Sequence, residues 1–311
     1  MEHKKYLIIM ITACVLILLL NWGVPKALVS AVLFLETGKV AAAQQTLPPA
    51  EETEPQPAVT EPTILRNEPH FSSKDLSYIR MQYGCDYRPD LETLLVKPLD
   101  WHLKENAPTV LILHTHATEG YAGTDGYRSQ NPEKNMVSIG AEIARVLEAG
   151  GIRVLHDTTF HDDPNYNTSY ASARQSIQRY LAQHPSIQLV LDIHRDASDN
   201  VGEQMVTSAT VGGQHSAQLM MVVGTDAGGN LHPNWQENLS LALKLTALLE
   251  QENPGICRPI NLRSERFNMD LTHGSLLVEV GAAGNTREEA LIAANALAQA
   301  VLALSQGANL S

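Results

Sequence analysis

TVLILHTHATEGY, Thr109–Tyr121, changes abruptly from an apolar run to a cluster of imidazole and carboxylate side chains. Its first part, Val110–Leu113, predicts a short buried strand. If the strand continues, His114 and His116 share one face of it, because side chains alternate between the two faces, and Glu119 follows in a loop. Imidazole and carboxylate are ligands of catalytic zinc, where about three protein ligands leave one position for water. By itself the stretch fits a metal site and a polar turn equally well.

From this stretch onward, strand-like and helix-like patterns alternate along the chain. Apolar spacing predicts helices over 135–151, 170–183 and 239–251, with a last helix after the capping box of Thr286 and Glu289. Apolar runs predict strands over 152–155, 187–192 and 275–280, and a hairpin of 205–211 with 219–223. This alternation predicts an α/β fold with a mainly parallel sheet and helices on both faces. In such sheets, sites form at the carboxyl ends of strands.

A second apolar run also ends in a charged cluster. Leu189–Leu191 leads into Asp192 and His194, which share a face if the strand persists. With His116 and Glu119, His194 completes a His-Glu-His set that leaves the fourth position of a metal ion for water. The sequence therefore predicts a metal site, and zinc is the metal that this ligand set favours.

Several charged groups near these ligands have more than one possible role. Asp192 or Asp196 could orient a metal-binding imidazole through its other ring nitrogen. Arg195 could stabilise the oxyanion of a carbonyl under attack, or it could form a salt bridge with Asp196. His114 could replace His116 as the ligand, or it could be a neighbour that supports the site.

The third signal is a carboxylate inside an apolar strand, Glu279 within Leu276–Gly281. Left unpaired, such a buried charge costs roughly several kcal/mol. Arg263 or Arg266 could pair with it, but we favour a general base beside the metal, with a pKa raised by burial. The residues together predict hydrolysis of an amide, in which Glu279 takes a proton from water and returns it to the leaving amine.

Composition limits the partners and the redox chemistry of the chain. Its 311 residues carry 22 basic and 34 acidic side chains, a net charge of −12, which argues against nucleic acid as a partner. Cys14 lies in the apolar N-terminus, so only Cys85 and Cys257 could form a disulfide. The sequence contains no Cys-x-x-Cys, which argues against a thiolate zinc site.

The N-terminal part predicts a membrane anchor. Residues 6–22 carry no charge and are just long enough to span a bilayer. Lys4 and Lys5 precede this run, which places residues 1–5 in the cytoplasm and the rest of the chain outside it. Ala41–Ala43 resembles a signal-peptide cleavage site, but it lies far from the apolar run, so we favour an uncleaved anchor.

The remaining chain divides by composition into three parts. Residues 23–69 predict a membrane-proximal segment followed by an acidic, proline-rich stalk. Residues 70–108 predict a segment that leads into the domain and packs on it. Residues 109–306 predict the catalytic domain.

Five separate motifs, in order, resemble the stage II sporulation protein P family of membrane-anchored peptidoglycan hydrolases from endospore-forming bacteria. They are HTHATEGY (114–121), HDTTFHDDPNYNTSY (156–170), LDIHRDA (191–197), HPNWQEN (232–238) and LLVEVGAAGNTREEA (276–290). The resemblance extends from about Pro108 to Ala300, and several motifs in the family's order are not expected by chance.

The resemblance implies a zinc-dependent N-acetylmuramoyl-L-alanine amidase that removes stem peptides from glycan strands, with endopeptidase activity on cross-links. It implies a role in engulfment of the forespore, with a lytic transglycosylase and a membrane-anchored scaffold as partners. It also implies a single-pass protein of the cell membrane with the catalytic domain outside the cytoplasm. The fold of the family is similar to the type 3 zinc amidases, which have a mixed sheet flanked by helices.

The resemblance also assigns residues. It matches His194 to a zinc ligand and Glu279 to the catalytic glutamate, and position in the strand favours His116 over His114 as the first ligand. For the second ligand we choose Glu119, which matches the Thr-Glu of the sporulation family. Glu133 is the alternative, because type 3 amidases place this glutamate at a helix start.

A substrate-binding groove is implied as well, and it would be lined by Tyr166, Asn167, Tyr170 and Arg174. The sequence departs from the family at Phe267–Met269, where Tyr-Asn-Gln is common. Two alternatives to the amidase stay open: a catalytically weak, wall-binding scaffold of the engulfment machinery, and another zinc amide hydrolase. A polysaccharide deacetylase is disfavoured, because the spaced His-x-x-x-His of that class is missing.

Overall fold

The computed structural model describes residues 70–123, 128–197 and 204–306. The predicted anchor over 6–22 and the predicted stalk within 23–69 lie outside these residues. The described residues form the α/β part of the chain.

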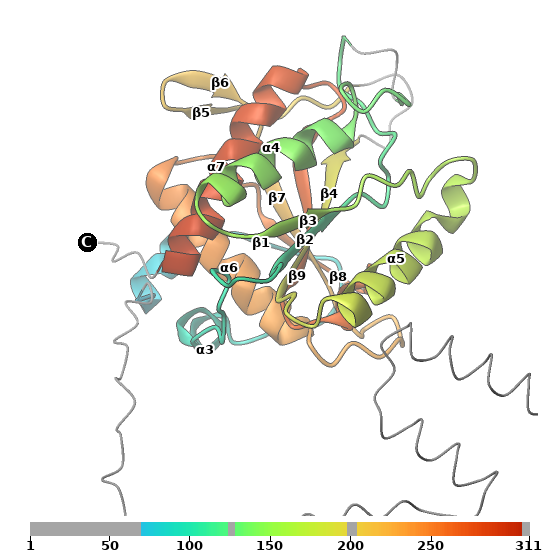
Figure 1. The fold of residues 1–311 in the computed structure, drawn as a ribbon. Coiled ribbons are helices and arrows are strands. Elements are labelled where there is room, and N and C mark those ends of the chain that lie inside the picture. The colour runs from blue at the N-terminus through green and yellow to red at the C-terminus, as the bar shows by residue number, and fades with distance from the viewer. Residues whose placement is uncertain (1–69, 124–127, 198–203, 307–311) are drawn as a thin grey trace, which may run out of the picture. The chain divides into compact units, whose positions relative to one another are not determined.

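A seven-stranded sheet forms the middle of the fold, in the order β1-β8-β7-β9-β4-β2-β3 (Figure 1). Its strands are β1 (Met81–Tyr83), β2 (Val110–Leu113), β3 (Val154–His156), β4 (Leu189–Asp196), β7 (Leu219–Gly224), β8 (Ile260–Arg263) and β9 (Ser275–Ala282). Neighbouring strands are parallel, except that β7 and β9 are antiparallel. The expected α/β fold with a mixed, mainly parallel sheet is confirmed.

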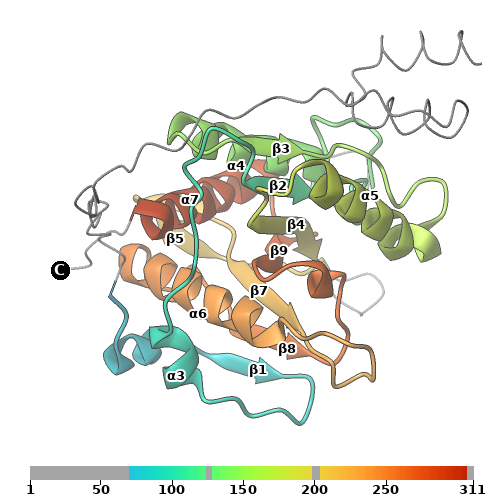
Figure 2. The same cartoon turned by 60° about the horizontal axis from the view of Figure 1, so that its bottom comes forward.

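Helices cover both faces of this sheet. They are α3 (Leu91–Val96), α4 (Met136–Ala149), α5 (Ser169–Gln183), α6 (Trp235–Glu252) and α7 (Arg287–Gln306), with short 3-10 turns η1 (Ser73–Tyr78), η2 (Tyr166–Thr168) and η3 (Met269–Leu271). Helices α4, α6 and α7 pack on one face, and α5 packs on the other (Figure 2).

Strand β2 is apolar throughout because both of its faces are buried. Ile112 packs into the core beneath α4, α6 and α7, whereas Leu111 and Leu113 pack against Ile177 of α5. All three strand residues are fully buried. A strand buried on both faces needs apolar side chains at every position, which is typical of parallel sheets between helices.

The predicted hairpin of 205–211 with 219–223 is wrong. Strand β5 (Ala209–Val211) pairs instead with β6 (Gln214–Ser216) in a separate two-stranded ribbon, and β7 enters the central sheet. The turn between β5 and β6 is Gly212-Gly213, where both residues have positive φ angles of 55° and 79°. Glycine adopts such angles without steric cost, so the chain reverses at once.

Two short strands were missing from the prediction. Strand β1, in the segment 70–108, pairs with β8 at one edge of the sheet. Both are too short to show a periodic pattern, and only the long-range pairing defines them.

Helix α7 is, among the described residues, the one helix long and apolar enough to cross a membrane, over Arg287–Ser305 at a mean hydropathy of 1.2. More than half of this segment, 56%, is buried within the fold. It packs against α4, α6 and β9. Its apolar face is therefore part of the domain core.

Candidate metal and hydrolytic site

His114 and His116 point to different sides of the sheet. Strand β2 ends before His114 and the chain turns over 115–118, so the strand alternation no longer applies. The expectation of a shared face is therefore not met. His114 is fully buried on the α4 side, where Nδ1 donates to the Ile193 carbonyl at 3.1 Å and Nε2 lies 2.9 Å from Nε2 of His156.

His116 lies on the α5 side, beside His194. The two rings are 5.3 Å apart between centroids and nearly perpendicular. Tyr166 stacks on His116 at 4.3 Å, and the ring of Tyr170 approaches it at 5.5 Å. Nδ1 of His116 is buried and has no hydrogen-bond partner among the described residues. Burial and the nearby His194 lower the pKa of His116 to about 4, so its imidazole is neutral.

His194, on β4, stands between two carboxylates. Its Nε2 lies 2.9 Å from Oδ1 of Asp192 and its Nδ1 lies 3.9 Å from Oε2 of Glu119. Asp192 is fixed in turn by Thr115, whose backbone N and Oγ1 donate to it at 2.8 and 2.6 Å. Burial opposes the charged imidazole, but Asp192, Glu119 and Glu279 outweigh it and raise the pKa of His194 to about 10.

Of the two aspartates proposed to orient a ligand, Asp192 is the one in contact with a histidine. Asp196 instead forms an ion pair with Arg258 at 2.6 Å. Nε of Arg195 donates to the Gly120 carbonyl at 2.9 Å.

Glu119 reaches the site because its loop is held on both sides. Its backbone N donates to the His116 carbonyl at 3.1 Å, and its carbonyl accepts from Met136 at 3.1 Å. Its carboxylate is buried near Arg195, whose backbone N lies 3.5 Å from Oε2. Burial raises the pKa of Glu119, and the charges of His194 and Arg195 partly offset the rise.

Glu279 lies directly opposite His194 in the parallel pairing of β9 with β4. Its Oε2 is buried and has no hydrogen-bond partner among the described residues. The two arginines considered as partners, Arg263 and Arg266, form ion pairs with other carboxylates. Burial raises the pKa of Glu279 to about 8, although the charges of His194 and Arg195 lower it.

A bulge follows Glu279 on β9. His194 pairs with Glu279 but Asp196 pairs with Ala282, so β9 carries one extra residue. Gly281 has a φ of 69°, and a Cβ there would lie 2.7 Å from the side chain of Ala217. Only glycine fits this position without strain, and the bulge ends the regular pairing just beyond the carboxylate.

The predicted substrate-binding residues are placed differently from one another. Tyr166 and Tyr170 both contact His116. Asn167 is exposed on η2, and its backbone N donates to Oδ1 of Asn165 at 3.1 Å. Arg174 forms a bidentate ion pair with Asp270 at 2.8 and 2.7 Å.

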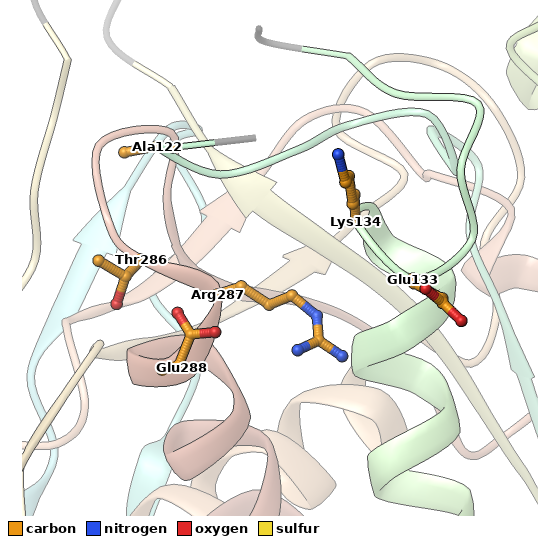
Figure 3. A pocket seen from close by; sticks show the side chains of 7 residues that line it. Ala122, Glu133, Lys134, Thr286, Arg287 and Glu288 are labelled. Atoms are coloured by element: carbon orange, nitrogen blue, oxygen red, sulfur yellow. The ribbon is translucent and has the colours of Figure 1, made fainter. Parts of the chain in front are cut away.

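Glu133, the alternative second ligand, lies in a different pocket. It is exposed, and with Lys134, Thr286, Arg287 and Glu288 it lines a cavity of about 640 Å³ at the starts of α4 and α7 (Figure 3). Of the two glutamates, only Glu119 has a carboxylate within an ion-pair distance of His194.

Two residues that the sequence did not single out hold the loop of the site. Asp162 accepts hydrogen bonds from Thr118, at 3.3 Å from the backbone N and 2.6 Å from Oγ1, and it contacts Arg128 at 3.4 Å. The guanidinium of Arg128 lies 4.4 Å from the centre of the Tyr166 ring. These contacts join loops that are distant in sequence, so no local pattern reveals them.

The donor set fits zinc in its chemistry. No three His, Cys, Asp or Glu side chains of the described residues are at coordinating distances as they stand. However, the buried Nδ1 of His116 and Oε2 of Glu279 have no partner there, and carboxylates crowd around His194. A divalent cation would satisfy these atoms and offset that negative charge. His116, Glu119 and His194 are the residues that could hold it.

The fold and the site define an α/β domain with a buried histidine–carboxylate centre at the carboxyl edge of its sheet. The sequence model of the Stage II sporulation protein P family matches residues 36–302, and the chain belongs to this family. Stage II sporulation protein P of Bacillus subtilis (strain 168) is 31% identical over 205 residues, which cover 61% of this chain and 49% of that protein. The chain thus spans about half the length of the curated relative.

Solved structures with some similarity include three amidases. N-acetylmuramoyl-L-alanine amidase AmiC2 of Nostoc punctiforme is 16% identical at a TM-score of 0.39, over 62% of this chain and 95% of that one. The CwlD amidase of Clostridioides difficile, solved with the GerS lipoprotein, is 13% identical at a TM-score of 0.37. The match covers 64% of this chain and 95% of that one. Ami1 of Mycobacterium smegmatis is 14% identical at a TM-score of 0.37. The match covers 66% of this chain and 99% of that one.

Proposed function

We propose that this chain is a zinc-dependent peptidoglycan hydrolase, an N-acetylmuramoyl-L-alanine amidase that removes stem peptides from glycan strands. One observation carries the proposal: neutral His116, buried Glu119 and Asp192-bound His194 meet opposite the unpaired carboxyl group of Glu279. Membership of the sporulation family supports the substrate. Cleavage of cross-links is a second activity that the family resemblance implies.

The residues of the chain divide the chemistry among them. Zinc held by His116, Glu119 and His194 would supply a Lewis acid for the amide carbonyl and would lower the pKa of water to about 7. Asp192 holds His194 with Nε2 toward itself, so that Nδ1 faces Glu119. Glu279 accepts a proton from the attacking water and gives it to the leaving nitrogen. Its buried carboxyl group has a raised pKa, which suits both transfers.

Arg195 would act as a fixed positive charge. Its Nε is held by the Gly120 carbonyl, and the charge lowers the pKa of both Glu119 and Glu279. We propose that it also stabilises the oxyanion of the amide carbonyl under attack.

The cellular setting is part of the proposal. The uncharged run over 6–22 would anchor the chain in the cell membrane, with the catalytic domain outside the cytoplasm. The family resemblance places such a hydrolase in forespore engulfment, together with a lytic transglycosylase and a membrane-anchored scaffold. The acidic, proline-rich stalk would let the domain reach the wall.

The bond that is cleaved tests the function. The full chain incubated with purified peptidoglycan should release free N-terminal alanine, and a chelator should stop the release until zinc is restored. Release of reducing sugar in place of amine would overturn the amidase assignment. Binding to peptidoglycan without release of either would favour the scaffold alternative.

The ligand set is tested by metal content. Wild-type protein should contain about one zinc per chain, and His194→Ala should contain much less. Because His114 and His116 differ in position but not in chemistry, His114→Gln is the matched control for His116→Gln. Loss of zinc from His114→Gln but not from His116→Gln would reverse the assignment.

A further inference from the structure

A groove of about 650 Å³ lies beside the candidate site, between the N-terminal part of α5 and the loop that leads into η3. Its walls include Tyr170, Arg174, Arg266, Phe267 and Asn268. The ring of Tyr170 lies 5.5 Å from that of His116 and 5.8 Å from that of Phe267. One side chain therefore separates the groove from the proposed metal ligand.

The groove carries more positive than negative charge. Arg174 and Arg266 both contact Asp270, which is nearly buried behind them, so one carboxylate serves two guanidinium groups. Glu265 also lines the groove, but it forms an ion pair with Arg263 at 3.2 Å. Such an arrangement stands out in a chain with a net charge of −12.

The guanidinium of Arg266 has N–H groups available to bind a ligand. The only hydrogen bond of its side chain in the described part of the chain is a long one, 3.5 Å from Nη1 to Oδ2 of Asp270. Its side chain is 32% exposed. A guanidinium carries five N–H groups in a planar fork that matches a carboxylate. Arg174, by contrast, uses its fork on Asp270 and holds that wall of the groove in place.

The backbone of the groove is held in an unusual conformation. Phe267 and Asn268 have positive φ angles of 49° and 62°. Asn268 stabilises this turn, because its Nδ2 donates to the Tyr170 carbonyl at 2.8 Å and its Oδ1 lies 3.4 Å from Nη1 of Arg174. Non-glycine residues persist at such angles only where neighbours hold them, commonly at sites that clamp a ligand.

We propose that this groove binds a carboxylate of the peptide part of the substrate, with Arg266 as the recognising group and the rings of Tyr170 and Phe267 as its walls. The inference rests on the proposed function, since peptidoglycan stem peptides carry free carboxylates. It adds that the protein selects acidic stem peptides over amidated ones.

Two probes that differ only in their carboxylates test this proposal: N-acetylmuramoyl-L-alanyl-D-glutamic acid and its diamide. Binding is measured with full-chain Glu279→Gln, which retains the groove. We expect the acid to bind about tenfold more tightly than the diamide, and the added change Arg266→Gln to remove this preference. Arg266→Lys should keep part of it, since lysine retains the charge without the fork.

Arg179→Gln is the control, because Arg179 is an exposed arginine of α5 that does not line the groove. It should keep the full preference for the acid. Equal binding of the acid and the diamide would overturn the inference. An undiminished preference for the acid in Arg266→Gln and Arg266→Lys would overturn it as well. Unfolding curves for each variant show whether it is folded.

Amine release from both probes by the wild-type protein separates the two proposals. Release without preference for the acid would leave the amidase standing and remove the groove assignment. Arg266-dependent binding of the acid without any release would support the groove and remove the amidase.

Discussion

The carboxyl group of Glu279 projects from an otherwise apolar strand. His194 lies opposite it on β4, and Glu119 is nearby. Burial raises the pKa of Glu279 from 4.5 to about 8. In the unfolded chain the same group ionises near its ordinary pKa. The metal-free fold is therefore destabilised least by this group below about pH 4.5, where both states hold the proton, and it loses stability as the pH rises from there to about 8.

Glu279→Gln should remove this pH dependence from the metal-free protein. Wild-type stability should fall by a few kcal/mol between pH 5 and pH 8, at about 1.4 kcal/mol per pH unit, because the unfolded chain releases this proton while the folded protein keeps most of it. The variant should show a smaller fall. Urea unfolding at both pH values, with a chelator present, measures the difference.

Glu288→Gln is the matched control for this prediction. Glu288 is an exposed glutamate on α7, so its replacement should leave the fall in stability as in the wild type. A fall in Glu279→Gln as steep as in the wild type would show that another group causes it.

At the scale of elements, α4 passes directly over buried His114 and half-buried His156. A Cβ at Gly140 would lie 2.6 Å from Nε2 of His114 and 2.7 Å from Nε2 of His156. The glycine thus allows the helix to approach β2 and β3, although glycine in a helix costs about 1 kcal/mol relative to alanine.

Gly140→Ala should destabilise the protein by about 1–3 kcal/mol, because the added methyl group overlaps two imidazoles and outweighs the better helix propensity. Thermal unfolding of a double-mutant cycle with His156→Ala checks the cause. The alanine should cost less once His156 is removed. Equal costs in both backgrounds would rule out the overlap with His156 as the cause.

Helix α6 stabilises the end of α3 through a buried lysine. Nζ of Lys244 donates to the carbonyls of Leu94 and Leu95 and to Oγ of Ser240 at 3.1 Å. These carbonyls lie in the last turn of α3, where no further helical N–H is available to them. The contact joins the segment before β2 to the domain core.

Lys244→Met should lower the free energy of unfolding by about 1–3 kcal/mol, because it leaves a buried helix end with an unpaired carbonyl. Oγ of Ser240 still donates to Leu94, so Leu95 bears most of the loss. Urea unfolding measures the effect, and exposed Lys104→Met is the control that should change little. A stability equal to that of the wild type would mean that the ammonium group does not stabilise α3.

For the whole molecule, the order of strands brings the site together. The neighbours β9, β4 and β2 carry Glu279, His194 and the loop with His116 and Glu119. These residues are far apart in the chain, and only the folded sheet makes them adjacent. A metal held by them should therefore bind the folded state much more strongly than the unfolded one.

Zinc at about 100 times its Kd should stabilise the fold by about 2.7 kcal/mol, or raise Tm by roughly 5–10 °C for a domain of this size. Thermal scans of the full chain with zinc and with chelator measure the shift. His116→Gln should abolish it and His114→Gln should keep it. A shift that survives in His116→Gln would place the metal elsewhere.

The fold class could be read from sequence because long helices and buried strands have strong periodicity. Leu189–Leu191 and Leu276–Val278 are uniformly apolar, and they form the two strands at the middle of the sheet. Strands β1 and β8 were not predicted because their pairing is long-range and their apolar runs are short. The hairpin was misassigned because the Gly212-Gly213 turn, and not the apolar pattern, determines which strands pair.

The sequence by itself determined which groups are available: imidazoles and carboxylates at strand ends, and a carboxylate inside an apolar strand. Only the tertiary structure decided which of them meet. His114 and His116 are chemically alike and two residues apart, but the chain turns after β2, so one faces α4 and the other faces His194. Glu119 and Glu133 are likewise alike in chemistry, but the fold buries the first and exposes the second. Side-chain chemistry is local, whereas proximity depends on pairing between distant strands.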